Sequence, residues 1–155
     1  MIALEPITTN QLYTKLIFEG KGESVKYTVH KTKPVGFVES VSVAACYIEF
    51  EGDYLFLKRG KDSNQPETWG VPAGKIKENE APLDALIREV REETAISLEK
   101  KSVKDLGKLW IDIPSIQYGY YLFYASLDER PSVLLNTENQ GFSWYKAEEV
   151  FSLDL

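Results

Sequence analysis

Three glutamates stand close together in the middle of the chain, at positions that an α-helix would bring to one face. Glu92 and Glu93 follow Glu89 by three and four residues, and residues at these spacings are neighbours on a helix surface. Like charges so placed repel one another and destabilise an isolated helix. A cation would neutralise them, and carboxylate oxygens are the ligands that hard ions such as Mg²⁺ or Mn²⁺ prefer. The spacing therefore indicates a divalent-metal site.

The residues around the glutamates predict the helix that must position them. Apolar side chains recur at steps of three and four residues, as on a helix packed against a core: Leu83, Leu86, Ile87 and Val90. Pro82 suits the first turn, where its missing N–H costs nothing. We expect Asn79 to cap this helix and Glu80 to lie in its first turn, where the helix dipole favours an anion. The preceding segment, 69–74 (WGVPAG), is punctuated by glycine and proline and predicts a strand leading into a loop.

The same segment contains a longer pattern that runs from residue 74 to residue 96. Its elements, all in register, are Gly74, Glu80, Arg88, Glu89, Val90, Glu92, Glu93 and Ile96. This arrangement resembles the signature of the Nudix hydrolases, the MutT-type nucleoside diphosphate-X pyrophosphohydrolases. Two positions depart from the family pattern. Ala95 stands where the family usually has glycine, and Ala73 stands where a second glycine is common before the signature.

The resemblance implies roles for these side chains. Glu92 and Glu93 are expected to be the firmest metal ligands, and Glu89 to be either a third ligand or the base that deprotonates the attacking water. Arg88 is expected to hold the glutamates in place through charge-assisted hydrogen bonds. The backbone carbonyl of Ala73 matches one that often binds a metal in the family. Without the pattern, an acidic helix of this kind would be read as a solvated surface.

A later glutamate is a further candidate for the catalytic site. Glu138 precedes Trp144 by six residues, in a segment that resembles one in many Nudix proteins. It would complete the metal site or act as the general base. The alternative is a solvated turn residue, since 136–139 (NTEN) is a turn-like run.

Substrate contacts are expected beside the metal site. Gly74 and Lys75 form the loop at the start of the signature, and glycine lets a backbone approach a ligand closely. Arg59 or Lys61, in the polar stretch before Trp69, is the candidate for a contact with phosphate.

Composition limits the classes of function. The chain has 155 residues and a net charge of −6, which argues against a non-specific nucleic-acid or membrane-surface binder. No stretch reaches the roughly 20 apolar residues of a membrane span, and the first residues lack the pattern of a secretory signal. Cys46, the single cysteine, lies in an apolar run and is expected to be a buried structural thiol. A cytoplasmic location is the simplest expectation.

The order of elements predicts an α+β fold. Strands are expected over 38–50, 54–58, 106–113, 118–127 and 141–145, with a final helix from Ala147. A mixed sheet between two helices follows, and the resemblance implies the Nudix-type α/β/α sandwich over 38–155. Residues 1–37 are expected to form an N-terminal β-rich extension, a β-hairpin packed on the core. Strands in this place mediate homodimers or shape the substrate pocket in some members of the family.

The expected reaction is metal-dependent water attack at a P–O–P bond. A nucleoside triphosphate, ordinary, oxidised or non-standard, is the favoured substrate. A dinucleoside polyphosphate, ADP-ribose or a nucleotide sugar is the alternative. A non-catalytic Nudix-like nucleotide-binding module is the alternative from another class, and the intact glutamate set argues against it.

Overall fold

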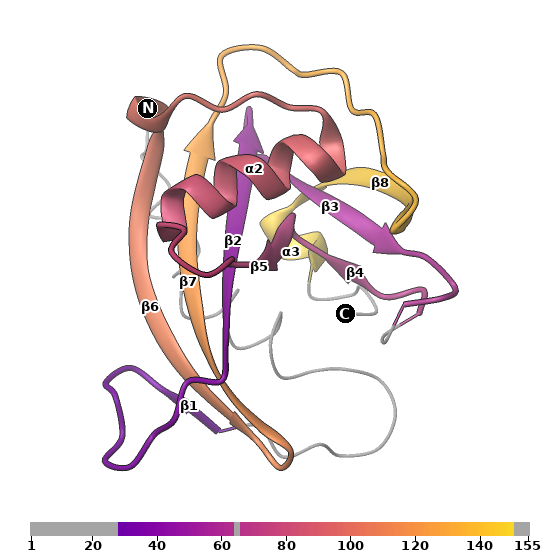
Figure 1. Cartoon of the computed structure of the whole chain (residues 1–155). Helices are drawn as coiled ribbons and strands as arrows, with labels where there is room; N and C mark the ends of the chain where they lie inside the picture. The colour runs from indigo at the N-terminus through magenta and orange to yellow at the C-terminus, as the bar shows by residue number, and fades with distance from the viewer. Residues whose placement is uncertain (1–27, 64–65, 151–155) are drawn as a thin grey trace.

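The computed structural model describes residues 28–63 and 66–150 (Figure 1). The elements are β1 (Thr28–His30), β2 (Val41–Phe50), β3 (Asp53–Arg59), β4 (Trp69–Gly70), β5 (Ala73–Lys75), α2 (Pro82–Thr94), a short 3₁₀ helix (Lys100–Ser102), β6 (Val103–Ile113), β7 (Ile116–Ser126), β8 (Asn139–Lys146) and α3 (Ala147–Val150). Within the described ranges no helix is long and apolar enough to cross a membrane.

The strands form one mixed sheet in the order β1-β6-β7-β2-β3-β4, with β5 paired to β2 and β8 paired to β3. The pairing of β2 with β7 is parallel from Val41 to Glu49, and the other pairings are antiparallel. The mixed sheet that the order of elements predicted is therefore confirmed.

Strands β2 and β3 separate soon after the turn that joins them, as Figure 1 shows. The turn consists of Glu51 and Gly52, both with positive φ (49° and 88°), as a two-residue hairpin turn of type I′ requires. Beyond the first two residue pairs, β2 pairs with β5 while β3 pairs with β8. An opening thus forms between the two groups of strands, and α2 lies beside it (Figure 1).

The two faces of the sheet carry separate hydrophobic clusters. Alternation along β2 directs Ala44, Cys46 and Ile48 to the face covered by α2, and Ala45 and Tyr47 to the opposite face with α3. The arrangement is the α/β/α sandwich predicted from the sequence. Cys46 is fully buried, and burial raises the pKa of its thiol, in agreement with a structural role.

The start of α2 differs from the expectation. The cap position is Ala81, without a side-chain cap, and Glu80 lies before the helix. The predicted capping by Asn79 is therefore wrong, and Asn79 instead has a left-handed backbone with φ of 61°. A residue before proline is restricted to extended conformations, so Pro82 sets the boundary: Ala81 has ψ of 145°.

The other end of α2 keeps the bend that glycine commonly provides. Ala95 has a left-handed backbone (φ 62°, ψ 14°), and its N–H donates to the carbonyl of Arg91 at 2.9 Å. This geometry is a helix C-terminal cap of the kind usually made by glycine. Alanine at position 95, where the family usually has glycine, therefore adopts the left-handed conformation that glycine commonly has at a helix end.

Only the end of the predicted N-terminal extension lies in the described part of the chain. Thr28–His30 pairs with β6, and His30 Nε2 lies 3.0 Å from Asp112 Oδ2. Residues 1–27, which make up most of the hairpin predicted within 1–37, lie outside the described residues.

Candidate functional site

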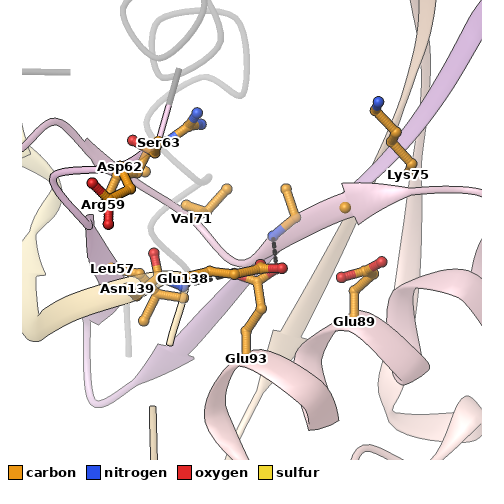
Figure 2. A pocket seen from close by; sticks show the side chains of 13 residues that line it. Leu57, Arg59, Asp62, Ser63, Val71, Lys75, Glu89, Glu93, Glu138 and Asn139 are labelled. Atoms are coloured by element: carbon orange, nitrogen blue, oxygen red, sulfur yellow. Dashed lines mark hydrogen bonds between the residues drawn. The ribbon is translucent and has the colours of Figure 1, made fainter. Parts of the chain in front are cut away.

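A cavity of about 560 Å³ lies at the opening between the two groups of strands. Its walls come from β3, β4, β5, α2 and the start of β8: Leu57, Arg59, Asp62, Ser63, Gly70, Val71, Ala73, Gly74, Lys75, Glu89, Glu93, Glu138 and Asn139. Most of the candidate residues of the sequence analysis therefore lie on one cavity wall, and the exceptions are Lys61, Arg88 and Glu92. Figure 2 shows the cavity from close by.

Helix α2 delivers two carboxylates to this cavity. Glu89 and Glu93 are one helical turn apart and both point toward β5 (Figure 2). The stripe containing Leu86 and Val90, both fully buried, fixes the rotation of the helix on the sheet. The predicted helix and its orientation thus place these glutamates beside the loop that precedes them in the sequence.

Glu93 is the most buried of the acidic side chains in the cavity, with 6% of its surface exposed. Its Oε1 accepts a hydrogen bond from Ala73 N at 3.2 Å, and its Oε2 accepts one from Asn139 Nδ2 at 3.2 Å. Burial, together with the neighbouring charges of Glu89 and Glu138, raises the pKa of Glu93 to about 8 despite these hydrogen bonds. The site therefore disfavours a lone negative charge, which a bound cation would stabilise.

Arg88 forms the centre of a hydrogen-bonded network with its neighbours. Its guanidinium donates twice to Glu80 at 2.8 Å, and to Glu89 at 2.7 Å, to Glu92 at 3.3 Å and to the carbonyl of Lys75 at 3.0 Å. The planar fork of arginine matches this use of several acceptors. The arginine does not line the cavity, so its geometry suits the positioning role that the resemblance implies.

Glu89 packs directly on the backbone of Gly74. A Cβ atom added to Gly74 would overlap with the carboxylate of Glu89, so any other residue at position 74 would displace that carboxylate. Burial raises the pKa of Glu89, and the contact with Arg88 opposes that shift. The glycine and the glutamate of the signature are thus parts of one contact.

Glu92 is placed differently from its two neighbours. Its side chain is 52% exposed, turned toward Arg88, and absent from the cavity wall. The expectation that all three helix carboxylates converge is met by Glu89 and Glu93 only. A role for Glu92 as a metal ligand stays a prediction.

Glu138 combines the two alternatives considered for it. It lies in a turn at residues 137–138, where its N–H donates to Asn136 Oδ1 at 3.2 Å. It also lines the cavity, and its charge adds a small contribution to the rise in the pKa values of Glu89 and Glu93 that burial mainly causes. Glu138 is therefore both a turn residue and one of the acidic residues that line the cavity.

Positive charge is present at the cavity through Arg59 and Lys75. The guanidinium of Arg59 passes beside Gly70, since a Cβ added there would lie 3.6 Å from its Nη2. Lys61 does not line the cavity, so of the two candidates for a phosphate contact the structure favours Arg59. In Figure 2, Arg59 lies with Asp62 and Ser63 at one side of the view and Glu89 at the other.

Sequence reasoning did not name Asn139, Asp62 or Ser63 as parts of the site. Asn139 is 46 residues from Glu93 in the chain and carries no motif of its own. Only its position directly after Glu138 could have drawn attention to it. Asp62 and Ser63 belong to the polar loop in which only cationic residues had been considered.

The chemistry of these side chains fits a hard divalent ion. Glu89, Glu93 and Glu138 provide carboxylate oxygens, which suit Mg²⁺ and Mn²⁺. Within the described residues, however, no three His, Cys, Asp or Glu side chains form a ready-made metal cluster. The donors are of the right type and share a cavity, but the side chains as they stand do not enclose a common point.

Comparisons with known proteins give the family. A family model described as the NUDIX domain matches residues 38–155. The nucleoside triphosphatase NudI of Enterobacter sp. (strain 638) is 32% identical over 117 residues, which cover 70% of this chain and 83% of that protein. The crystal structure of the MutT protein from Methanosarcina mazei Go1 superposes with a TM-score of 0.64 at 23% identity, covering 73% of this chain and 81% of that one.

A second solved structure, the solution structure of the E. coli ORF135 protein, has a TM-score of 0.64 at 25% identity and covers 79% of this chain and 85% of that one. The chain belongs to the Nudix family. It is a pyrophosphohydrolase. Hydrolases of this family generally depend on divalent metal ions.

Proposed function

We propose that the protein hydrolyses a nucleoside triphosphate at a P–O–P bond, with Mg²⁺ or Mn²⁺ as cofactor. The observation that carries this proposal is the sharing of one cavity by four carboxylates, three of them glutamates, and two cationic side chains. Arg59 and Lys75 suit the charges of a polyphosphate chain, and Glu89, Glu93 and Glu138 suit a metal ion.

Glu89 and Glu93, with the carbonyl oxygen of Ala73, are the groups that would hold the ion. A divalent ion bound there neutralises phosphate charge and lowers the pKa of the attacking water. Glu89 and Glu138 are the two candidates for the general base, because both line the cavity as carboxylates. The water oxygen forms a new bond to phosphorus while the bridging P–O bond breaks, and the products are a nucleoside monophosphate and pyrophosphate.

The substrate class rests on size, charge and similarity. A cavity of about 560 Å³ falls within the range of roughly 300–1,000 Å³ typical of small-molecule sites. The relative NudI, 32% identical, is named a nucleoside triphosphatase, which supports a triphosphate. A dinucleoside polyphosphate, ADP-ribose and a nucleotide sugar carry the same P–O–P bond and belong in the same assay.

The test is the release of phosphate or pyrophosphate from a panel of these compounds, with and without Mg²⁺. We expect turnover of at least one nucleoside triphosphate, and a fall in kcat of about 100-fold for Glu93→Gln, since metal-ion catalysis supplies several kcal/mol. Glu99→Gln is the matched control, because Glu99 is 70% exposed and does not line the cavity.

Each result has a separate meaning. Turnover of dinucleotides or nucleotide sugars without triphosphate turnover would contradict the proposed substrate class but support hydrolysis of a P–O–P bond. Full activity in Glu93→Gln would contradict the metal assignment. Nucleotide binding without any product at saturating metal would identify a binding module instead of a catalyst.

A further inference from the structure

Asn139 is the residue through which the last strand reaches the acidic helix. It is the first residue of β8, and its Nδ2 donates to Glu93 Oε2 at 3.2 Å. Only the amide nitrogen of asparagine can donate to a carboxylate, so this contact fixes the orientation of the amide. The other oxygen of Glu93 accepts from Ala73 N at 3.2 Å. Each carboxylate oxygen of Glu93 is therefore held by one donor.

Both of these donors are uncharged, which distinguishes Glu93 from Glu89. Glu89 is bound by the guanidinium of Arg88 at 2.7 Å, a contact that neutralises part of its charge. An amide and a backbone N–H orient a carboxylate without cancelling its charge, whereas a lysine or arginine in their place would compete with a metal ion. Glu93 is thus held in place by groups that would leave the charge of its carboxylate to a bound metal ion.

Asn139 also connects Glu93 to other parts of the cavity. It directly follows Glu138, whose carbonyl accepts from Gly60 N at 2.9 Å, and it lies opposite Arg59 in the register of β3 and β8. A shift in this register occurs between Lys58 and Arg59, at the end of the strand pair. The hydrogen bond to Glu93 therefore connects α2 to the segment that carries Glu138, and this segment in turn contacts the end of β3.

We propose that Asn139 is a positioning residue for the metal site: its amide holds the carboxylate of Glu93 in the orientation that binds a divalent ion. Partners that hydrogen-bond to metal ligands commonly set the affinity of the site in this way. The proposal rests on the proposed metal-dependent hydrolysis. It assigns no contact with substrate to Asn139.

The test is the affinity of the purified full chain for Mn²⁺, measured from the electron paramagnetic resonance signal of the free ion. We expect Asn139→Ala to weaken Mn²⁺ binding by about 10-fold or more. Asn139→Leu, which keeps the branched shape of the side chain but cannot donate, should do the same and leaves no room for a water to replace the amide. Gln140→Ala removes an amide from the next residue, which is exposed and outside the cavity wall, and should bind Mn²⁺ like the wild type.

A kinetic measurement separates positioning from a general loss of structure. In the Asn139 variants the Mg²⁺ concentration for half-maximal rate should rise by a similar factor, while kcat at saturating Mg²⁺ recovers most of the wild-type value and KM for the nucleotide changes little. A defect that Mg²⁺ does not relieve would overturn the proposal, as would unchanged Mn²⁺ affinity in both variants.

The outcome for the proposed function is independent of this result. Mn²⁺ binding that depends on Asn139, in a wild type that turns over no nucleotide, would support the positioning role and contradict the hydrolysis. Nucleotide turnover by the wild type, with equal Mn²⁺ affinity in the wild type and the Asn139 variants, would support the hydrolysis and contradict the positioning role. A wild type that binds no Mn²⁺ would overturn the positioning role, and the panel assay would still decide on the hydrolysis.

Discussion

The carboxylate of Glu89 occupies the space in which a side chain at residue 74 would begin. A Cβ atom added to Gly74 would overlap with the Cδ and both oxygens of Glu89. Gly74 does not have a positive φ, so glycine here permits the close approach of Glu89 and does not serve an unusual backbone conformation. Glu89 is also bound to Arg88 at 2.7 Å, which limits its freedom to move aside. The fixed interval between glycine and glutamate in the signature thus reflects a contact in the folded protein.

The variant Gly74→Ala should therefore lower activity by displacing Glu89. We expect kcat to fall by roughly 100-fold, since a misplacement of about 1 Å at a catalytic group has an effect of this size. Far-ultraviolet circular dichroism should show an unchanged fold. Gly141→Ala is the matched control, because its added Cβ would meet only Lys58 Cβ at 3.9 Å. Equal activity in the two alanine variants would contradict the steric argument.

The buried carboxyl of Glu93 should make stability depend on pH when divalent ions are chelated. Its pKa is raised from 4.5 to about 8, so the folded protein binds more protons than the unfolded chain between these values. The stability that the protonated Glu93 contributes to the folded protein is fully present below about pH 4.5 and is lost as pH rises through 8. We expect the melting temperature of the wild type, relative to Glu93→Gln, to fall by several degrees between pH 5 and pH 8.

Divalent ions should reverse this loss at the upper end of the range. An ion that binds only the folded protein stabilises it in proportion to the logarithm of its concentration, so Mg²⁺ at pH 8 should raise the melting temperature of the wild type more than that of Glu93→Gln. The argument fails if the difference between the two proteins is the same at every pH.

Glu80 should give the opposite pH dependence, in acid. Its hydrogen bonds to Arg88, and secondly to the N–H of Lys77, lower the pKa of Glu80 from 4.5 to about 2. The contribution of Glu80 to the stability of the folded protein is therefore present above pH 4.5 and is lost as pH falls through 2. The wild type should be more stable than Glu80→Gln at pH 6, and this difference should shrink toward pH 2 in thermal unfolding followed by circular dichroism. Glu99→Gln controls for the loss of one surface carboxylate, and a difference that persists at pH 2 would contradict the assignment.

Local patterns were sufficient to predict helix α2 and most of the strands. The apolar stripe containing Leu86 and Val90 predicted both the helix and its buried face, because periodicity reports directly on burial. The predicted strands over 38–50 and 54–58 left Glu51 and Gly52 between them, where the structure has its hairpin turn. The start of the helix was placed wrongly since Asn79 is a good capping residue in general, whereas the constraint that decided the boundary was Pro82.

The contacts between distant segments could not be predicted from the sequence. The direction of Glu92 depends on a guanidinium that other acceptors also share, and helical spacing alone does not settle that competition. The contact of Asn139 with Glu93 joins two elements that meet only because β2 and β3 separate and β8 pairs with β3. Residue spacing thus predicted that Glu89 and Glu93 lie together, but neither the different placement of Glu92 nor the neutral groups that contact Glu93.

The left-handed backbone of Ala95 should be a source of instability that a single substitution removes. An alanine with φ of 62° has its Cβ close to the following carbonyl group, at a cost of about 1 kcal/mol relative to glycine. Ala95→Gly should therefore raise the free energy of unfolding by about 1 kcal/mol, or the melting temperature by a few degrees for a chain of this length. Ala95→Val should lower it, because a β-branched residue tolerates this conformation less well. Urea unfolding of the three proteins measures both effects, and a Gly variant less stable than the wild type would show that the helix end is not strained.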